Sequence, residues 1–171
     1  MNARHLMLAL SLLPLAACGE EPKPVEEKVA PAAFPAGEWE VTSTTEKLTS
    51  TDKTTPATAH KVGQVETNKV CSPAGPKPAP ALFADKGDDC KLDSDYAKDG
   101  RLNMALQCMR PGRGQVAVTL DGKYDEQTFE VLVVTATQFS GSGDYSLTQK
   151  MTGKRLGDCA AGTGAAAPAA G

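Results

Sequence analysis

Apolar and polar residues alternate along most of the chain between residues 36 and 159, and no helical repeat is sustained there. Trp39 and Val41 alternate with charged and hydroxyl-bearing residues, which predicts a half-buried strand at the start of this region. A turn is expected over residues 52–56 and a second strand over residues 57–70. The alternation continues downstream, with apolar residues at Leu102, Met104, Leu106, Cys108, Val116, Val118, Leu120, Tyr145, Leu147 and Met151. The pattern predicts an all-β fold, an antiparallel meander of about seven strands that forms a sandwich or a partly open barrel.

Two segments depart from this alternation. Residues 71–86 are so rich in proline and glycine that a regular strand is excluded, and we expect a crossover loop with one short helical turn near residues 80–86. Residues 129–136 are apolar on both faces, which predicts a central strand covered on two sides. That strand is interpreted either as a core strand or as the wall of an apolar cavity that holds a small molecule.

The first residues have the composition of an export signal. Arg4 and His5 precede an apolar run over residues 6–15, which is too short to act as a membrane-spanning anchor. The tetrad Leu-Ala-Ala-Cys that ends at Cys18 resembles the lipobox of bacterial lipoproteins. This resemblance implies that residues 1–17 are removed as a signal peptide and that Cys18 receives diacylglycerol and acyl chains such as palmitate. The alternative is ordinary signal cleavage that leaves Cys18 as a free thiol.

The rest of the chain divides into three segments. Residues 18–35 combine the lipidated cysteine with a spacer rich in Pro, Glu and Ala. Residues 36–159 form a single β domain, and residues 160–171 form an Ala- and Gly-rich tail that we expect to be disordered. Gly19 stands where lipoproteins retained at the inner membrane have Asp, so the resemblance favours the outer membrane. The predicted location is the cell envelope, with the domain facing the periplasm and attached to the membrane through lipid on Cys18.

Charge and hydropathy exclude two further classes of protein. The formal net charge is −3 and the basic residues are scattered, whereas a nucleic-acid-binding protein needs a basic face or stripe. No stretch reaches the roughly 20 apolar residues of a membrane-spanning helix. We therefore expect no nucleic-acid partner and no integral membrane domain.

Four cysteines remain after Cys18 is set aside, an even number that favours disulfides in an oxidising compartment. If the chain forms a hairpin that turns at residues 98–100, residues whose numbers sum to 198 face each other. Tyr96 then opposes Leu102, and Cys90 opposes Cys108, which suits a disulfide between neighbouring strands.

The second disulfide would then join Cys71 to Cys159, although four cysteines allow three connectivities. Zinc is the competing interpretation, but no two of these cysteines have the short separation found in structural zinc sites. We expect neither a metal nor a cofactor.

The cysteines also carry a family resemblance. They belong to an ordered series of motifs: Gly37-Glu38-Trp39-Glu40, Val70-Cys71-Ser72-Pro73, Asp89-Cys90, Gln107-Cys108 and Gly153-Lys154-Arg155-Leu156-Gly157-Asp158-Cys159. The series resembles the domain-of-unknown-function family 3617, small exported proteins of Gram-negative bacteria. The chain departs from that pattern in two ways: Ala36 stands between Pro35 and Gly37, and no run of Met follows the first strand. The resemblance implies an exported β-rich domain with two disulfides and implies no activity.

Few residues suit catalysis. His60 is the one histidine left after removal of the signal, and its Thr-rich surroundings predict an exposed, solvated side chain rather than a general base. The aspartates between residues 85 and 99 are interpreted as solvated, because their spacing fails the calcium-loop pattern. The candidates for a basic patch that binds an anionic envelope component are Arg110, Arg113, Lys150, Lys154 and Arg155.

Two functions of different class fit this sequence. The first is a non-catalytic binding module for a small apolar ligand or an envelope component. The alternative is a structural or inhibitor-type lipoprotein that contacts an envelope protein. A third and less favoured function is a hydrolase that uses two close carboxylates, so we expect no enzyme. A hollow interior favours the first function, and a filled interior with an exposed apolar patch favours the second.

Overall fold

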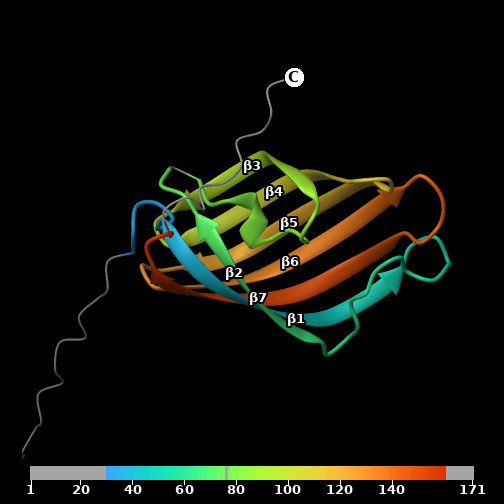
Figure 1. The fold of residues 1–171 in the computed structure, drawn as a ribbon, viewed down its shortest axis with the longest axis horizontal. Helices are drawn as coiled ribbons and strands as arrows, with labels where there is room; N and C mark the ends of the chain where they lie inside the picture. The colour runs from blue at the N-terminus through green and yellow to red at the C-terminus, as the bar shows by residue number, and fades with distance from the viewer. Residues whose placement is uncertain (1–29, 76, 161–171) are drawn as a thin grey trace, which may run out of the picture.

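Seven antiparallel strands form one open sheet in the computed structural model, which describes residues 30–75 and 77–160 (Figure 1). The strands lie in the order β2-β1-β7-β6-β5-β4-β3, so β2 and β3 form the two edges. The prediction of an all-β antiparallel fold is confirmed. The strands are β1 Gly37–Ser50, β2 Val65–Ser72, β3 Asp89–Lys98, β4 Arg101–Arg110, β5 Gly114–Tyr124, β6 Thr128–Phe139 and β7 Tyr145–Gly157.

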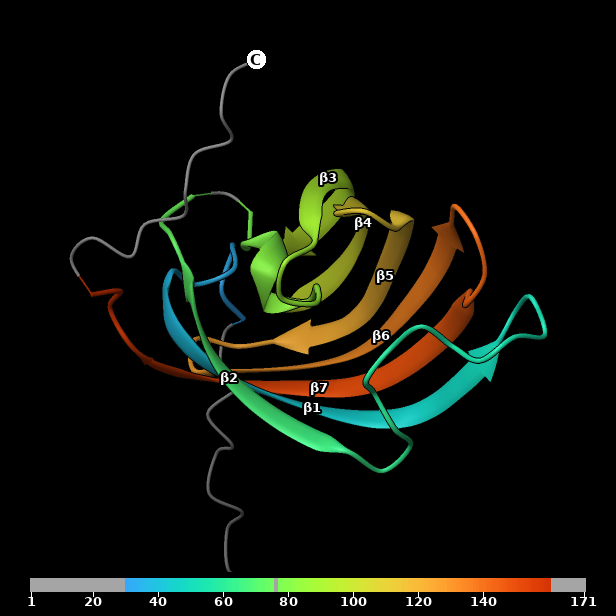
Figure 2. The same cartoon turned by 45° about the vertical axis from the view of Figure 1, so that its right-hand side comes forward.

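The sheet curves into a trough, and the core fills its concave face (Figure 2). Strand β6 illustrates the difference between the two faces, because Val131 and Val133 are buried whereas Leu132, between them, is 47% exposed. The sequence correctly placed this strand at the centre of the sheet. The prediction that both of its faces are covered is wrong, since no layer of the described chain packs on the convex face.

The connection from β2 to β3, residues 73–88, is called the crossover and lies across the concave face (Figure 2). Strand β2 ends at the end of the trough where Trp39 lies, called the Trp39 end, and β3 begins at the opposite, Tyr145 end. The crossover must therefore run the length of the trough. It carries the short 3-10 helix η1 Pro80–Leu82, which confirms the predicted helical turn. Leu82 and Phe83 are buried against the sheet.

Aromatic side chains fill the Trp39 end of the trough. The rings of Phe34, Trp39 and Phe129 lie with centroids 4.9–6.0 Å apart, and Phe83 and Tyr124 extend the group. Phe34 is buried although it falls within the predicted spacer. The packed domain therefore begins before residue 36.

The loop between β1 and β2 is longer than the sequence predicted. Residues 51–64 form the β1–β2 loop, and β2 begins only at Val65, so the expected strand over residues 57–70 started too early. The backbone of Thr45 holds the loop, because its N–H donates to Gln64 and its carbonyl accepts from Gly63. The carboxylate of Asp52 accepts from the backbone N–H groups of Gly143 and Asp144 in the β6–β7 turn. These contacts fold the loop back over the trough.

The hairpin of β3 and β4 contains the disulfide between Cys90 and Cys108, as predicted. The predicted register is wrong near the turn, where Ala97 and not Tyr96 opposes Leu102. Asp99 and Gly100 both have positive φ and form a two-residue turn between the paired Lys98 and Arg101.

A β-bulge in β3 accounts for the difference between the register near the turn and the register at the disulfide. Leu92 pairs with Leu106 and Ser94 with Ala105, so Asp93 is an extra residue in β3. The bulge shifts the pairing by one residue and thereby brings Cys90 opposite Cys108.

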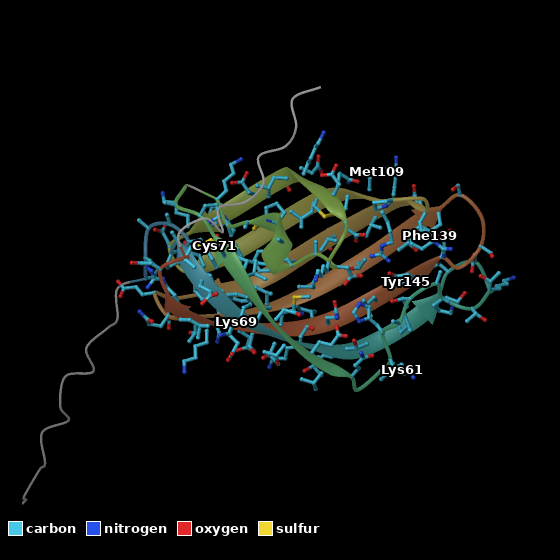
Figure 3. The ribbon with its side chains drawn as sticks, in the orientation of Figure 1. Lys61, Lys69, Cys71, Met109, Phe139 and Tyr145 are labelled. Atoms are coloured by element: carbon cyan, nitrogen blue, oxygen red, sulfur yellow. A yellow bond between two sulfur atoms is a disulfide. The ribbon has the colours of Figure 1, made fainter. Side chains whose placement is uncertain are left out.

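The second disulfide joins Cys71 to Cys159, with the two Cα atoms 5.5 Å apart. It lies at the Trp39 end, where Figure 3 labels Cys71, while Phe139 and Tyr145 are labelled at the other end. Both β2 and the segment after β7 flank the start of β1, because Glu38 pairs with Cys71 on one side and with Gly157 on the other. The disulfide therefore fastens the β2 edge to the end of β7.

Candidate functional site

A pocket of about 710 Å³ lies on the concave face, between the sheet and the two segments that cross it. Its volume falls within the range of small-molecule sites. The β1–β2 loop forms one upper wall through residues 57–60, and the crossover forms the other through residues 81, 82 and 84–86. Alternate residues of three neighbouring strands form the floor: Val41 and Ser43 of β1, Asn68 and Val70 of β2, and Gln149 and Met151 of β7.

Strand register brings these floor residues together. Ser43 pairs with Met151 of β7 on one side and with Glu66 of β2 on the other. Thr45 pairs with Gln149 in the next concave row. Directly paired residues of antiparallel strands point to the same face, so the side chains of Ser43 and Gln149 are neighbours beneath the pocket.

A network of charged side chains, called the rim network, borders the pocket toward the Tyr145 end. It consists of His60, Asp85, Asp88, Arg110 and Tyr145. Arg110 donates two hydrogen bonds to Asp88, one to Asp85 and one to the Tyr145 hydroxyl, all between 2.7 and 2.8 Å long. The network therefore joins β4, the crossover and β7.

His60 extends the rim network to the β1–β2 loop. Its Nε2 lies 3.0 Å from Oδ1 of Asp85, and its Nδ1 lies 3.6 Å from Glu66. The hydrogen bond to Asp85 raises the pKa of His60 above the ordinary 6.5, against the opposing effect of burial. Burial disfavours the ionised form of Asp85, but His60 and Arg110 outweigh it and lower the pKa of this carboxyl. Both partners are therefore stabilised in their charged forms.

The rim network leaves few groups free for proton transfer. All four carboxylate oxygens of Asp85 and Asp88 lie within hydrogen-bond distance of Arg110 or His60. Both ring nitrogens of His60 face carboxylates, so a protonated imidazole is favoured and no nitrogen is left as a base. The arrangement is that of an ion-pair network that holds two loops to the sheet.

The predictions from the sequence were wrong for three residues of this network. His60 is not exposed and solvated, because only 12% of its side chain is accessible. Asp85 and Asp88 are not solvated turn residues, because both bind Arg110. These partners are separated from Arg110 by more than 20 positions. No local pattern could have indicated the pairing, whereas the folded-back loops bring the groups together.

The five basic residues predicted as a patch lie in three places. Arg110 and Arg113 lie at the Tyr145 end, where both guanidinium groups lie near the ring of Phe139. Lys150 lies on the convex face of β7 and pairs with Glu130. Lys154 and Arg155 lie near the opposite end of β7, where Arg155 binds the Ala36 carbonyl and Asp158. The sheet does not bring the five together.

Two other depressions of similar size lie on the convex side of the sheet. One includes Tyr96, Leu132 and Lys150 and has a volume of about 820 Å³, and the other includes Glu40, Thr42 and Lys154 and has about 690 Å³. Both are lined mainly by charged and hydroxyl side chains of the exposed face. The concave pocket is the stronger candidate because two segments of the chain cover it and because its floor combines the apolar Val41, Val70 and Met151 with buried polar groups.

The predicted lipidation site, Cys18, lies outside the described residues, as do the predicted signal peptide and residues 161–171 of the tail. In residues 30–75 and 77–160, no helix is long and apolar enough to cross a membrane. Within the same residues, no group of three or more His, Cys, Asp or Glu side chains is arranged to hold a metal ion. The four cysteines predicted to form disulfides do so.

Comparison with known proteins identifies a family without an assigned role. The family described as "Protein of unknown function (DUF3617)" matches residues 30–159, which is more than half of the chain. No curated protein and no solved structure matches the chain. The matched range begins at residue 30, the first described residue, and ends at Cys159, so it covers the whole trough.

Proposed function

We propose that this chain, which belongs to the DUF3617 family, is a non-catalytic binding module that holds a small, mainly apolar ligand in the concave pocket. The pocket itself carries the proposal. A single curved sheet would fill its concave face if it served only as a scaffold, as the aromatic residues do at the Trp39 end. Between β1, β2, β7 and the crossover, space of about 710 Å³ is left instead.

The rim network supports binding rather than catalysis. Arg110 and His60 occupy the carboxylates that a hydrolase of the two-carboxylate type would need. The imidazole of His60 faces Asp85 and Glu66, which favours the protonated ring and not a general base. We therefore infer that these groups shape the pocket and do not react.

Attachment to the cell envelope is part of the same proposal. Two disulfides suit an oxidising compartment. The lipobox-like tetrad supports lipidation of Cys18 at the periplasmic side of a membrane, with the outer membrane favoured. Phe34 is packed at the Trp39 end, so the described chain begins at the end opposite the rim network.

Binding can be tested with N-phenyl-1-naphthylamine, an uncharged dye whose fluorescence rises in apolar surroundings. We expect the mature domain to bind it and Asn68→Trp to prevent binding, because Asn68 lines the pocket from β2. Lys69→Trp is the matched control, because Lys69 is also exposed, occupies the adjacent position and faces the convex side.

Equal dye binding by both variants and the wild type would contradict the proposal. Native mass spectrometry of the protein purified from envelopes complements this test, since a co-purifying small mass identifies a ligand. A co-purifying protein without a small mass would favour the structural or inhibitor-type alternative.

A further inference from the structure

The floor of the pocket holds two polar side chains that are almost fully buried. Gln149 is 3% exposed and Ser43 is 8% exposed. Among residues 30–75 and 77–160, neither the carboxamide of Gln149 nor the hydroxyl of Ser43 has a hydrogen-bond partner on another side chain. No fully enclosed side-chain N or O atom in these residues is unpaired. The polar atoms of Gln149 and Ser43 therefore reach the space inside the pocket.

Unpaired polar groups at such depth need an explanation. Burial of an amide or hydroxyl without a hydrogen bond is unfavourable, and buried polar groups in folded proteins nearly always have partners. Valine, as at the neighbouring Val41, would fill either position without this cost. The carboxamide and the hydroxyl together offer donors and acceptors to a group that enters from above.

We propose that the pocket binds an uncharged amphipathic molecule, with an amide, hydroxyl or carbonyl end inserted between Gln149 and Ser43 and its apolar body along Val41, Val70 and Met151. This inference rests on the proposed binding function and names the chemical class of its ligand. The apolar body would continue toward Leu82 of the crossover, which lines the same pocket.

The charges around the pocket explain why the ligand is uncharged. The guanidinium of Arg110 is occupied by Asp85 and Asp88, and His60 is occupied by Asp85. Lys86 lines the pocket from the crossover, whereas Glu66 pairs directly with Ser43 and faces the pocket beside the floor. Gln64 donates a hydrogen bond to the Glu66 carboxylate and Nδ1 of His60 lies 3.6 Å from it, so this carboxylate is already paired. A charged ligand end between Gln149 and Ser43 would therefore meet two uncharged groups and a carboxylate that is already paired, and an unpaired buried charge costs far more than an unpaired amide.

Four ten-carbon compounds with different ends test this ligand class: decanamide, 1-decanol, decanoate and decyltrimethylammonium. Each is titrated at pH 7.5 against N-phenyl-1-naphthylamine bound to the mature domain. We expect decanamide and 1-decanol to displace the dye at concentrations about tenfold lower than either ion, because the ions must be desolvated without a counter-ion. Equal displacement by all four would overturn the inference.

Substitutions of a floor residue provide a second test of the ligand class. Gln149→Leu should weaken decanamide about tenfold more than it changes the affinity for the dye, which has no amide end. Gln149→Glu should favour decyltrimethylammonium over decanamide, because it places a carboxylate at the floor. The matched control is Gln138→Leu, which changes an exposed carboxamide on β6.

The outcomes separate the inference from the function on which it rests. If the wild type does not bind the dye, or if Asn68→Trp binds it normally, the binding function itself fails. If the dye binds and Asn68→Trp excludes it, but Gln149→Leu leaves decanamide binding unchanged, only the ligand class fails. Should Gln149→Leu unfold, Ser43→Ala gives the same readout with a smaller change in volume.

Discussion

Arg110 and Asp88 form a two-point ion pair, with Nε and one terminal nitrogen of the guanidinium each 2.7 Å from a carboxylate oxygen. The Asp88 side chain is 2% exposed, so this carboxylate lies out of contact with water. The pair joins the last residue of β4 to the crossover just before β3 begins. It thereby holds in place the segment that covers the concave face.

Removal of the guanidinium should be costly. Arg110→Ala leaves the Asp88 carboxylate buried without its counter-ion, and we expect the free energy of unfolding to fall by about 3 kcal/mol. Urea denaturation measures the loss. The control is Arg113→Ala, which removes an exposed arginine near the same Phe139 ring and should cost about 1 kcal/mol or less. Equal losses for the two variants would show that the ion pair does not hold the crossover.

His60 should make stability depend on pH. Its folded pKa is raised, so its contribution is fully present below the ordinary value of 6.5 and is lost as the pH rises through the folded pKa. We expect His60→Gln to destabilise the domain more at pH 5.5 than at pH 8.5. Urea denaturation of both proteins at the two pH values measures this, and a gap that widens with pH would contradict it.

Gly153 allows the closest contact in the aromatic core. A Cβ at this position would clash with the edge of the Phe129 ring, at Cε1, Cδ1 and Cζ. Gly153→Ala should therefore destabilise the domain by about 1–3 kcal/mol, the usual cost of an added methyl group in a filled core. Gly75→Ala is the control, because nothing lies within 4 Å of a Cβ there. Thermal unfolding compares the two, and an unchanged Gly153→Ala would show that the ring can move aside.

The two disulfides should contribute unequally. Their loops span 18 and 88 positions, for which the chain-entropy relation gives about 3 and about 4.6 kcal/mol. We expect the double variant C71S/C159S to lose more stability than C90S/C108S in urea. Thiol titration of the unfolded, unreduced mature domain should find no free sulfhydryl, and four would refute both bridges.

Lipidation predicts a membrane-bound protein. Cys18→Ala should release the protein from the membrane fraction, because stable anchoring requires the acyl chains. Fractionation of cell envelopes followed by detection of the protein measures this. Continued membrane association of the variant would contradict the assignment of Cys18.

Local patterns predicted the fold better than the site. Apolar and polar residues alternate along a strand because one face is buried and the other is exposed. The apolar positions, such as Leu102, Val116 and Val131, therefore indicated both the strands and their inward faces. The covered second face of β6 was predicted wrongly because Leu132 and Val134 are apolar. A single open sheet leaves such residues on its outer face, and hydrophobicity alone does not reveal this.

The site depends on contacts that no local pattern contains. His60 and Asp85 lie in separate loops with no regular structure, so their approach follows from the path of the crossover across the trough. Ser43 and Gln149 occupy inward-facing positions in the same alternation as Trp39 and Val41 in β1 and as Leu147 and Met151 in β7. A polar residue at an inward-facing position of each strand indicates a polar pocket floor. This interpretation requires knowledge that β1 and β7 are neighbours in the sheet.

The bulge at Asp93 has an effect beyond the alignment of two sulfur atoms. Strand β3 is an edge of the sheet, and a straight edge readily accepts an additional strand from another molecule. An extra residue twists the edge locally, and Asp93 adds an exposed negative charge at that point. Deletion of Asp93 would still leave Cys90 opposite Cys108, but it would straighten the strand. A twisted and charged edge of this kind disfavours pairing with the edge of another copy.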